Sequence, residues 1–276
     1  MLRGRSFIFK PVSGDKQLAT RAQYNSYWND SRLNDIPNEF GWRATGFAPA
    51  IVASNVDVWE RSTAYVFPSV GEWQVRSTDL NDALGGTGAE TVRIWLIDEN
   101  KDILNPEFGI AGSFVEVELN GTTPVNISPG DQFSCALVMD VELGNINQGE
   151  IILEPLGGGT EILVILPTKG RTHTLTGCVP RGHNALIHDL PVQCIKTLGG
   201  PITEVLFELQ VDRQGNGAFN ALIPGMATTQ SPSEGQYKVP WLIEELNNFR
   251  LRITDNFASN TAIFASMGIV IIKDID

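Results

Sequence analysis

Apolar and polar positions alternate along many short runs of this chain, and turn residues separate the runs. Glu90–Ile97 alternates at its start, and the alternation of residues 115–119 runs into Asn120-Gly121. Successive side chains of a strand point to opposite faces of a sheet, so this pattern predicts half-buried strands. Further predicted strands are residues 63–67, 132–140, 150–154, 160–166, 171–178, 184–196, 202–211, 218–223, 248–254 and 261–273. Strands at this spacing predict an all-β protein built from sandwiches or jelly rolls rather than βαβ units.

Two dipeptides predict tight turns, and one segment predicts helix. Asn120-Gly121 is a strong hairpin signal and predicts a type I′ turn, in which both central residues have positive φ. Arg181-Gly182 predicts a second hairpin between strands 171–180 and 183–195. Pro240 followed by Trp241–Leu246 predicts one helical turn at most, because proline favours the first helical position.

Composition along the chain predicts two domains and an arm. Residues 17–58 are polar, Asn-rich and irregular, which is typical of a long loop or extended arm. Glycine and proline gather at residues 155–159 and 167–170, and a length of 276 residues suits two domains of ordinary size. The predicted parts are an extended N-terminal arm and long loop over residues 1–58, a first β-sandwich domain over 59–168 and a second over 169–276.

Charge is unevenly distributed and singles out the N-terminal segment. The formal net charge of -12 argues against nucleic-acid binding, which needs clustered Lys and Arg. Residues 1–22 carry five cationic residues and one Asp, a balance of +4, so the other 254 residues carry -16. This segment is a candidate docking arm for an acidic neighbouring subunit or shell, and one mode of docking is addition as a strand to an exposed sheet edge. Its candidate residues are Arg3, Arg5, Phe7, Ile8, Phe9 and Lys10. The alternatives are a solvated terminus and a first strand of the protein's own sandwich.

No catalytic, cofactor-binding or metal-binding residues are predicted. His173, Cys178, His183, His188 and Cys194 lie within 22 residues, but they lack the close Cys-x-x-Cys spacing of a zinc site. No apolar run approaches the roughly 18 residues of a membrane helix, and the start lacks the apolar core of a signal peptide. Three cysteines are too few for a disulfide scaffold and fit a protein made in a reducing cytoplasm.

Five motifs between residues 57 and 127 carry a family resemblance. They are Asp57-Val-Trp59, Tyr65-Val-Phe-Pro68, Gly85-Gly-Thr-Gly-Ala-Glu-Thr-Val-Arg-Ile94, Leu96-Ile-Asp-Glu-Asn100 and Val117-Glu-Leu-Asn-Gly-Thr-Thr-Pro-Val125. In this order they resemble a family of virion structural proteins from tailed double-stranded DNA phages, especially marine and cyanobacterial ones. The chain departs from the family at Ile97, where that turn usually has Leu, and at Ile103–Ser113, where an insertion predicts a local extension.

The resemblance implies a non-enzymatic structural protein of a tailed bacteriophage virion, assembled in the host cytoplasm. A head-surface decoration or head-attached protrusion is the first interpretation. The alternative is a tail or tail-fibre adaptor, or a carbohydrate-binding module for host attachment; an enzyme such as a depolymerase is disfavoured because no acid pair or triad stands out. The expected partners are major capsid or tail proteins and further copies of the chain, with a trimer as the usual symmetry of such additions.

Overall fold

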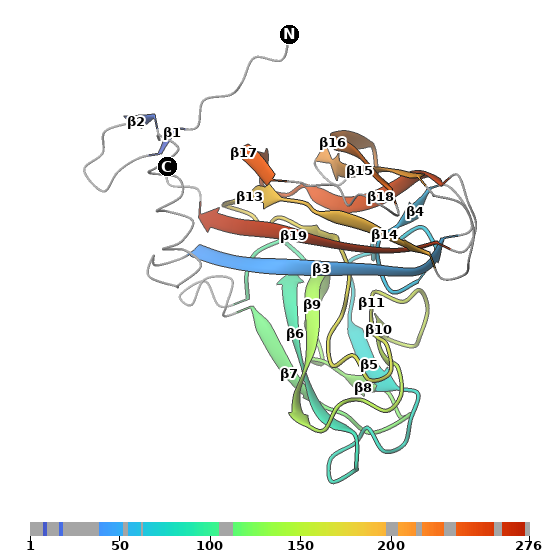
Figure 1. The fold of residues 1–276 in the computed structure, drawn as a ribbon. Coiled ribbons are helices and arrows are strands. Elements are labelled where there is room, and N and C mark those ends of the chain that lie inside the picture. The colour runs from blue at the N-terminus through green and yellow to red at the C-terminus, as the bar shows by residue number, and fades with distance from the viewer. Residues whose placement is uncertain are drawn as a thin grey trace.

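The computed structural model describes residues 8–9, 17–18, 39–51, 55–61, 63–104, 113–196, 204–213, 217–228, 236–256 and 261–273. All the secondary-structure elements among them are β-strands, so the predicted all-β class is confirmed. Most strands belong to two sandwiches, a larger one and a smaller one, which lie end to side in Figure 1.

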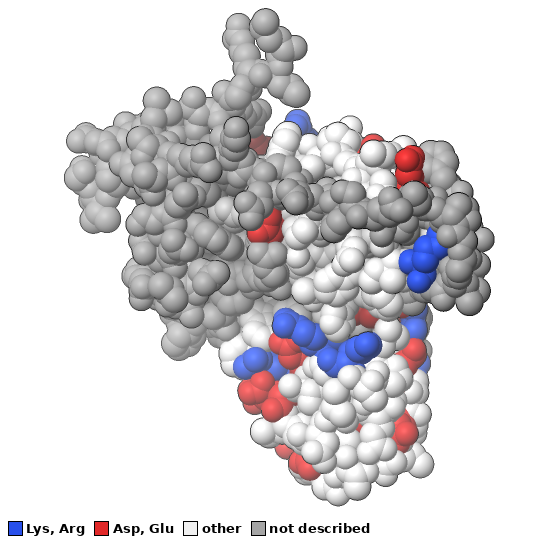
Figure 2. All heavy atoms as spheres, viewed as in Figure 1, with Lys and Arg blue, Asp and Glu red and all other residues white. Residues whose placement is uncertain are grey.

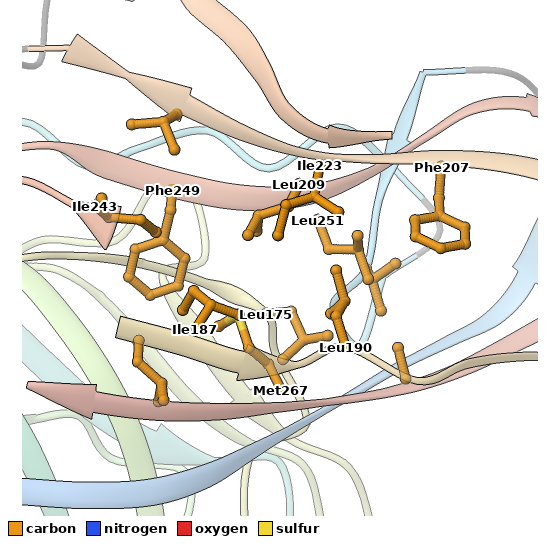
Figure 3. Packing of buried hydrophobic residues seen from close by; sticks show 14 of the residues in the cluster. Leu175, Ile187, Leu190, Phe207, Leu209, Ile223, Ile243, Phe249, Leu251 and Met267 are labelled. Carbon is orange, nitrogen blue, oxygen red and sulfur yellow. The ribbon is translucent and has the colours of Figure 1, made fainter. Parts of the chain in front are cut away.

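The larger sandwich packs two antiparallel sheets face to face. In the first sheet β19 (Thr261–Lys273) is central, and β3 (Glu39–Ile51) pairs along one of its edges. Along the other edge β19 pairs with both β13 (His183–Asp189) and β14 (Val192–Lys196), and β17 (Gln236–Ile243) pairs with the outer edge of β13. The second runs β16 (Phe219–Thr228), β15 (Glu204–Asp212), β18 (Asn248–Asn256), and then β12 (Thr176–Cys178) and β4 (Val56–Asp57) along the far edge of β18. Figure 3 shows Leu209, Phe249 and Leu251 of one sheet pointing toward Ile187 and Met267 of the other. Removing these side chains from water is the main source of the sandwich's stability.

The smaller sandwich packs a three-stranded sheet on a four-stranded one. The first runs β7 (Phe114–Glu118), β6 (Ala89–Asp98), β9 (Phe133–Gly144), and the second runs β11 (Leu163–Ile165), β10 (Ile151–Pro155), β5 (Trp73–Ser77), β8 (Val125–Asn126). Trp73 and Leu153 meet Ile94 and Met139 in its core. The apolar positions of β6 that alternate in the sequence are therefore those that face this core.

The smaller sandwich is an insertion into the larger one. It occupies the chain between β4 and β12, and these two strands pair with neighbouring parts of β18. The predicted long loop of residues 1–58 is therefore wrong over β3 and β4, because Glu39–Ile51 pairs with almost the whole length of β19. Glycine, alanine and proline interrupt the alternation of β3, and pairing with a distant strand decides its conformation. The division at residues 168 and 169 into independent domains stays a prediction.

The two sandwiches share the strands β6 and β9. Ile94 and Leu96 of β6 lie in the smaller core, whereas Ile97 and, on β9, Cys135 and Leu137 lie in the larger one. The β6–β9 register shifts between Trp95 and Leu96 and again after Ile97. Such bulges rotate the strand, so residues close in sequence can reach different cores.

Both predicted hairpins are wrong. β7 pairs with β6 while β8 pairs with β5, so Asn120-Gly121 carries the chain from one sheet to the other. Only Gly121 of the pair has positive φ, at 58°, which excludes a type I′ turn. The turn at Arg181-Gly182 exists, but β12 pairs with β18 and β13 pairs with β17 and β19. A tight turn between two strands predicts a hairpin only when the strands stay in one sheet.

Two predicted local conformations also differ from the structure. Residues 63–67 form no strand, because the backbone nitrogen of Tyr65 donates to the carboxylate of Asp57 instead of to a neighbouring strand. The predicted helical turn at Trp241–Leu246 is wrong, since Trp241 and Leu242 belong to β17 and pair with Ile187 and Leu186. Pairing within the sheet overrides the local preference of Pro240 for a helix start.

Candidate docking surface

Three sets of loops meet at the end of the smaller sandwich that lies away from the larger one (Figure 1). They are residues 78–88, 119–124 and 143–150, and we refer to them together as the tip. Backbone hydrogen bonds connect them: Leu84 donates to the carbonyl of Leu119, and Asn145 donates to that of Gly88. The tip is therefore one connected structure rather than three separate loops.

The carboxylate of Asp82 holds the tip together from inside. It is fully buried, and it accepts hydrogen bonds from the hydroxyl of Ser77 at 2.7 Å and from the backbone nitrogens of Ala89, Gln148 and Gly149 at 2.9 Å each. Hydrogen bonds to an ionised group inside a protein are stronger than those between neutral groups. One side chain thus fixes the first and third loops of the tip in a single arrangement.

Gly88 of the Gly85–Ile94 motif makes room for this carboxylate, and Gly121 makes room for Leu80. A Cβ on Gly88 would lie 2.1 Å from Oδ1 of Asp82, which no side chain could tolerate. Gly121 combines a φ of 58° with the close approach of Leu80, whose Cα would lie 3.1 Å from an added Cβ. Glycine is required at both positions by the geometry of the tip, and neither position contributes a reactive group.

The tip exposes large apolar side chains. Leu80, Leu84 and Leu143 are 75%, 64% and 58% exposed, the highest values for large apolar residues in the described part of the chain. Ile146, in the same loops, is 52% exposed. Scattered apolar residues are ordinary on a surface, but several on one braced end are typical of an interaction site.

The tip is also acidic. The segments 77–92, 114–125 and 141–150, which form its loops and the nearest ends of the adjoining strands, contain seven Asp or Glu and no Lys or Arg; Arg76 and Arg93 lie further along β5 and β6. Of these, Glu142 pairs with Arg93 at 3.2 Å and Glu150 with Arg61 at 2.8 Å, while Glu116 and Glu118 are exposed on β7. On the face drawn in Figure 2, basic side chains gather over the upper ends of β6 and β9, above the tip. A partner for the tip would be apolar and positively charged.

A second buried carboxylate fastens the segment 55–68 to the larger sandwich. Asp57 is fully buried and accepts hydrogen bonds from Nε and Nη2 of Arg252, at 2.8 and 3.1 Å, and from the backbone nitrogen of Tyr65 at 2.7 Å. Arg250 lies 3.6 Å away. The first residue of the Asp57-Val-Trp59 motif is thus used entirely for internal bonding.

Aromatic residues of the same motifs continue this attachment. The rings of Trp59 and Tyr65 meet edge to face at 5.2 Å, as do those of Tyr65 and Phe67 at 5.0 Å. Phe67 stacks on Phe219 of β16 at 5.4 Å, and the guanidinium of Arg250 lies 3.7 Å above the ring of Phe219. These contacts add packing and cation–π energy at the edge of the larger sandwich.

Glu60 is a buried acid beside this attachment. Burial raises its pKa from 4.5 to about 8, so the carboxyl is mostly protonated at neutral pH. Its Oε1 accepts a hydrogen bond from the backbone nitrogen of His173, and its Oε2 has no hydrogen-bond partner. Burial likewise lowers the pKa of His173 and raises that of Tyr65. The acid is enclosed by protein and does not line a surface that a substrate could reach.

The predicted docking arm is described only in part. Ile8 and Phe9 form β1, which pairs antiparallel with Leu18 and Gln17 of β2 (Gln17–Leu18) as a separate two-stranded sheet. Outside the described part of the chain lie the other predicted members, Arg3, Arg5, Phe7 and Lys10. A two-stranded ribbon is at best marginally stable alone. Docking of this arm stays a prediction.

Sequence reasoning missed the tip and its brace. A weak signal exists in Asp79-Leu80-Asn81-Asp82-Ala83-Leu84, where two leucines stand among polar residues and next to glycines. Asp82 itself could not be singled out, because three of its four donors are backbone groups. Among the described residues no group of three or more His, Cys, Asp or Glu could hold a metal ion, and no helix is long and apolar enough to cross a membrane.

Comparison with known proteins gives little. No protein-family model and no curated protein sequence matches the chain. Among solved structures, a chain from the structure of the Gt strain of infectious bursal disease virus is 10% identical, with a TM-score of 0.14. The alignment covers 86% of this chain and 71% of that chain. The VP2 subviral particle of the same virus is matched at 9% identity and a TM-score of 0.15, with the same coverage. Likeness to these viral proteins is weak, and scores this low carry no argument about fold or function.

Proposed function

We propose that this chain is a non-enzymatic structural protein of a tailed bacteriophage virion, located on the head surface as a decoration or head-attached protrusion. The proposal starts from the order of the five motifs between residues 57 and 127, which resembles that of a virion protein family. Its expected partners are the major capsid protein, tail proteins and other copies of the chain.

One observation about the motifs supports a building block most strongly. The motif aspartate Asp57 is fully buried and bonded internally, and the motif glycine Gly88 leaves room for the equally buried Asp82. Carboxylates that act on a substrate must be able to reach it, whereas these two determine the shape of the protein. The motif residues therefore support the shape of the protein. The exposed leucines of the tip take no part in these internal hydrogen bonds.

A second candidate function, host attachment through carbohydrate, rests on the outer face of the β7–β6–β9 sheet. Phe114 is 37% exposed, its ring lies 6.0 Å from that of Trp95, and Arg93 lies over both rings. A sugar would contact the exposed part of Phe114 and the guanidinium of Arg93, which covers the ring faces. Glycan-array binding that Phe114→Ala abolishes would favour this function over a purely structural one.

Immunogold electron microscopy of purified virions tests the proposed location. Antibody raised against the recombinant chain should label the head surface of intact particles. Labelling of the tail or fibres would favour the alternative of a tail adaptor. An absence of label from both intact and disrupted particles would contradict a role in the virion.

A further inference from the structure

The exposed leucines of the tip lie on a braced surface. Leu80 and Leu84 project from the loop that the buried Asp82 carboxylate holds, and Leu143 adjoins the loop bonded to the same carboxylate through Gln148 and Gly149. Because the loops are held in place from inside, they cannot easily fold over to cover these side chains. Burial by another segment would stabilise the complex without a large cost in loop ordering.

The charge of the tip restricts what that segment can be. Its loops and the strand ends next to them, residues 77–92, 114–125 and 141–150, carry seven acidic residues and no Lys or Arg. Arg93, further along β6, pairs with one of these acids, Glu142, whereas Glu116 and Glu118 are exposed on β7 beside the tip. An acidic partner would be repelled. A short segment that is both apolar and basic would cover the exposed leucines and also be attracted by the negative charge of the tip.

The chain itself contains such a segment. Residues 1–22 have a net charge of +4, in contrast to -16 for the remainder, and hold the apolar run Phe7-Ile-Phe9 between Arg5 and Lys10. Ile8 and Phe9 of this run form β1, which pairs only with the two-residue strand β2 among the described residues, so β1 has a further edge for a partner. We infer that the N-terminal segment of a second copy of this chain docks on the tip. The inference rests on the proposed function, since it specifies one contact of a protein that assembles in several copies.

The arrangement of the fold favours a second copy over the chain's own segment. The segment leads into β3 of the larger sandwich, whereas the tip lies at the far end of the smaller one (Figure 1). Docking on its own tip would require the intervening residues to run along the length of the molecule. A contact between different surfaces of identical chains is heterologous, and it closes into a ring when the rotation allows.

Sedimentation equilibrium of the full chain tests the apolar part. Wild type should associate reversibly, and Leu84→Gln and Leu143→Gln should each weaken association by about tenfold, because each removes an apolar side chain from the contact. The matched control is Leu156→Gln, the same substitution at another exposed leucine, whose side chain is 48% exposed. Leu156 follows β10 at the end of its sheet opposite the tip, since Pro155 pairs with Trp73 and Ile151 with Ser77. Its association should equal that of wild type.

A charge exchange tests the pairing directly. Arg3→Glu with Arg5→Glu, and Glu118→Lys alone, should each weaken association, and the three changes together should restore part of it. Raising the salt concentration should weaken wild-type association, because the Debye screening length falls to about 3 Å at 1 M salt. Unchanged melting temperatures would confirm that the variants fold.

Three outcomes overturn the inference. They are a wild-type monomer at all concentrations, equal weakening by Leu156→Gln and Leu84→Gln, and no recovery on charge exchange. A monomer that is nevertheless found in virions refutes this inference and leaves the proposed function intact. Tip-dependent association of a protein absent from virions refutes the proposed function alone.

Discussion

Three buried carboxyl groups show how differently single residues can be accommodated in this protein. The carboxylate of Asp82 accepts four hydrogen bonds. The carboxylate of Asp57 accepts hydrogen bonds from the guanidinium of Arg252 and from the backbone nitrogen of Tyr65. Glu60 receives one bond and leaves one oxygen without a partner. A buried carboxyl costs free energy unless hydrogen bonds compensate for the lost water, and Glu60, with one bond, has its pKa raised by burial to about 8.

Asp82→Asn should destabilise the protein by about 3 kcal/mol, because an amide nitrogen cannot accept and leaves buried donors without partners. The measurement is the free energy of unfolding by urea. Asp79→Asn is the control, since the Asp79 carboxylate accepts hydrogen bonds from the backbone and side-chain nitrogens of Asn81 in an exposed turn. Its effect should stay below about 1 kcal/mol. Equal, small effects of the two changes would contradict the bracing role of Asp82.

Gly121→Val should cost about 1–2 kcal/mol, because a β-branched residue fits positive φ poorly and would crowd Leu80. The change in melting temperature measures this. Gly71→Val is the control, since Gly71 does not have positive φ and an added Cβ would meet nothing within 4 Å. A wild-type melting temperature for Gly121→Val would contradict the turn geometry.

Glu60→Gln should remove one pH dependence of stability. The pKa of Glu60 is raised from 4.5 unfolded to about 8 folded, so between these values the folded state binds a proton that the unfolded state lacks. The contribution of Glu60 to the free energy of unfolding therefore falls as the pH rises, by up to about 1.4 kcal/mol per pH unit. Glutamine mimics the neutral acid, so the advantage of the variant over wild type should grow from pH 5 to pH 7.5. An advantage independent of pH over that range would show that Glu60 is ionised in the fold.

At the scale of elements, alternation in the sequence predicted strands well where one face meets a core. β6 follows its predicted run closely because Ile94 and Leu96 face apolar neighbours, and β19 does so for the same reason. β3 could not be predicted, because small residues such as Gly46 and Ala48 contact the larger core without the alternation of large apolar side chains. The hairpin interpretation of Asn120-Gly121 failed because no local signal reports that the next strand joins another sheet.

Gly46→Val tests whether β3 belongs to the sandwich. A Cβ on Gly46 would lie 2.7 Å from Leu175 and 2.8 Å from Val58, so a larger side chain should overpack the core and cost about 1–3 kcal/mol. The free energy of unfolding measures the effect. If residues 39–51 were a loop outside the core, this change would leave stability unaltered.

For the molecule as a whole, the sequence predicted the all-β class but not the insertion, and the building-block character stays a prediction. The smaller sandwich begins and ends beside β18, and its strands β6 and β9 contribute Ile97 and Leu137 to the larger core. Such long-range neighbours leave no trace in local periodicity. The tip was equally hidden, since exposure of Leu80 and Leu84 depends on contacts among loops distant in sequence.

The number of copies per particle tests the central proposal most directly. Quantitative mass spectrometry of purified virions gives the ratio of this chain to the major capsid protein and to the tail proteins. A head-surface protein should be present in large excess over the tail proteins and in a simple ratio to the capsid protein. Parity with the tail proteins would contradict the head location, and absence from purified particles would contradict a structural role in the virion.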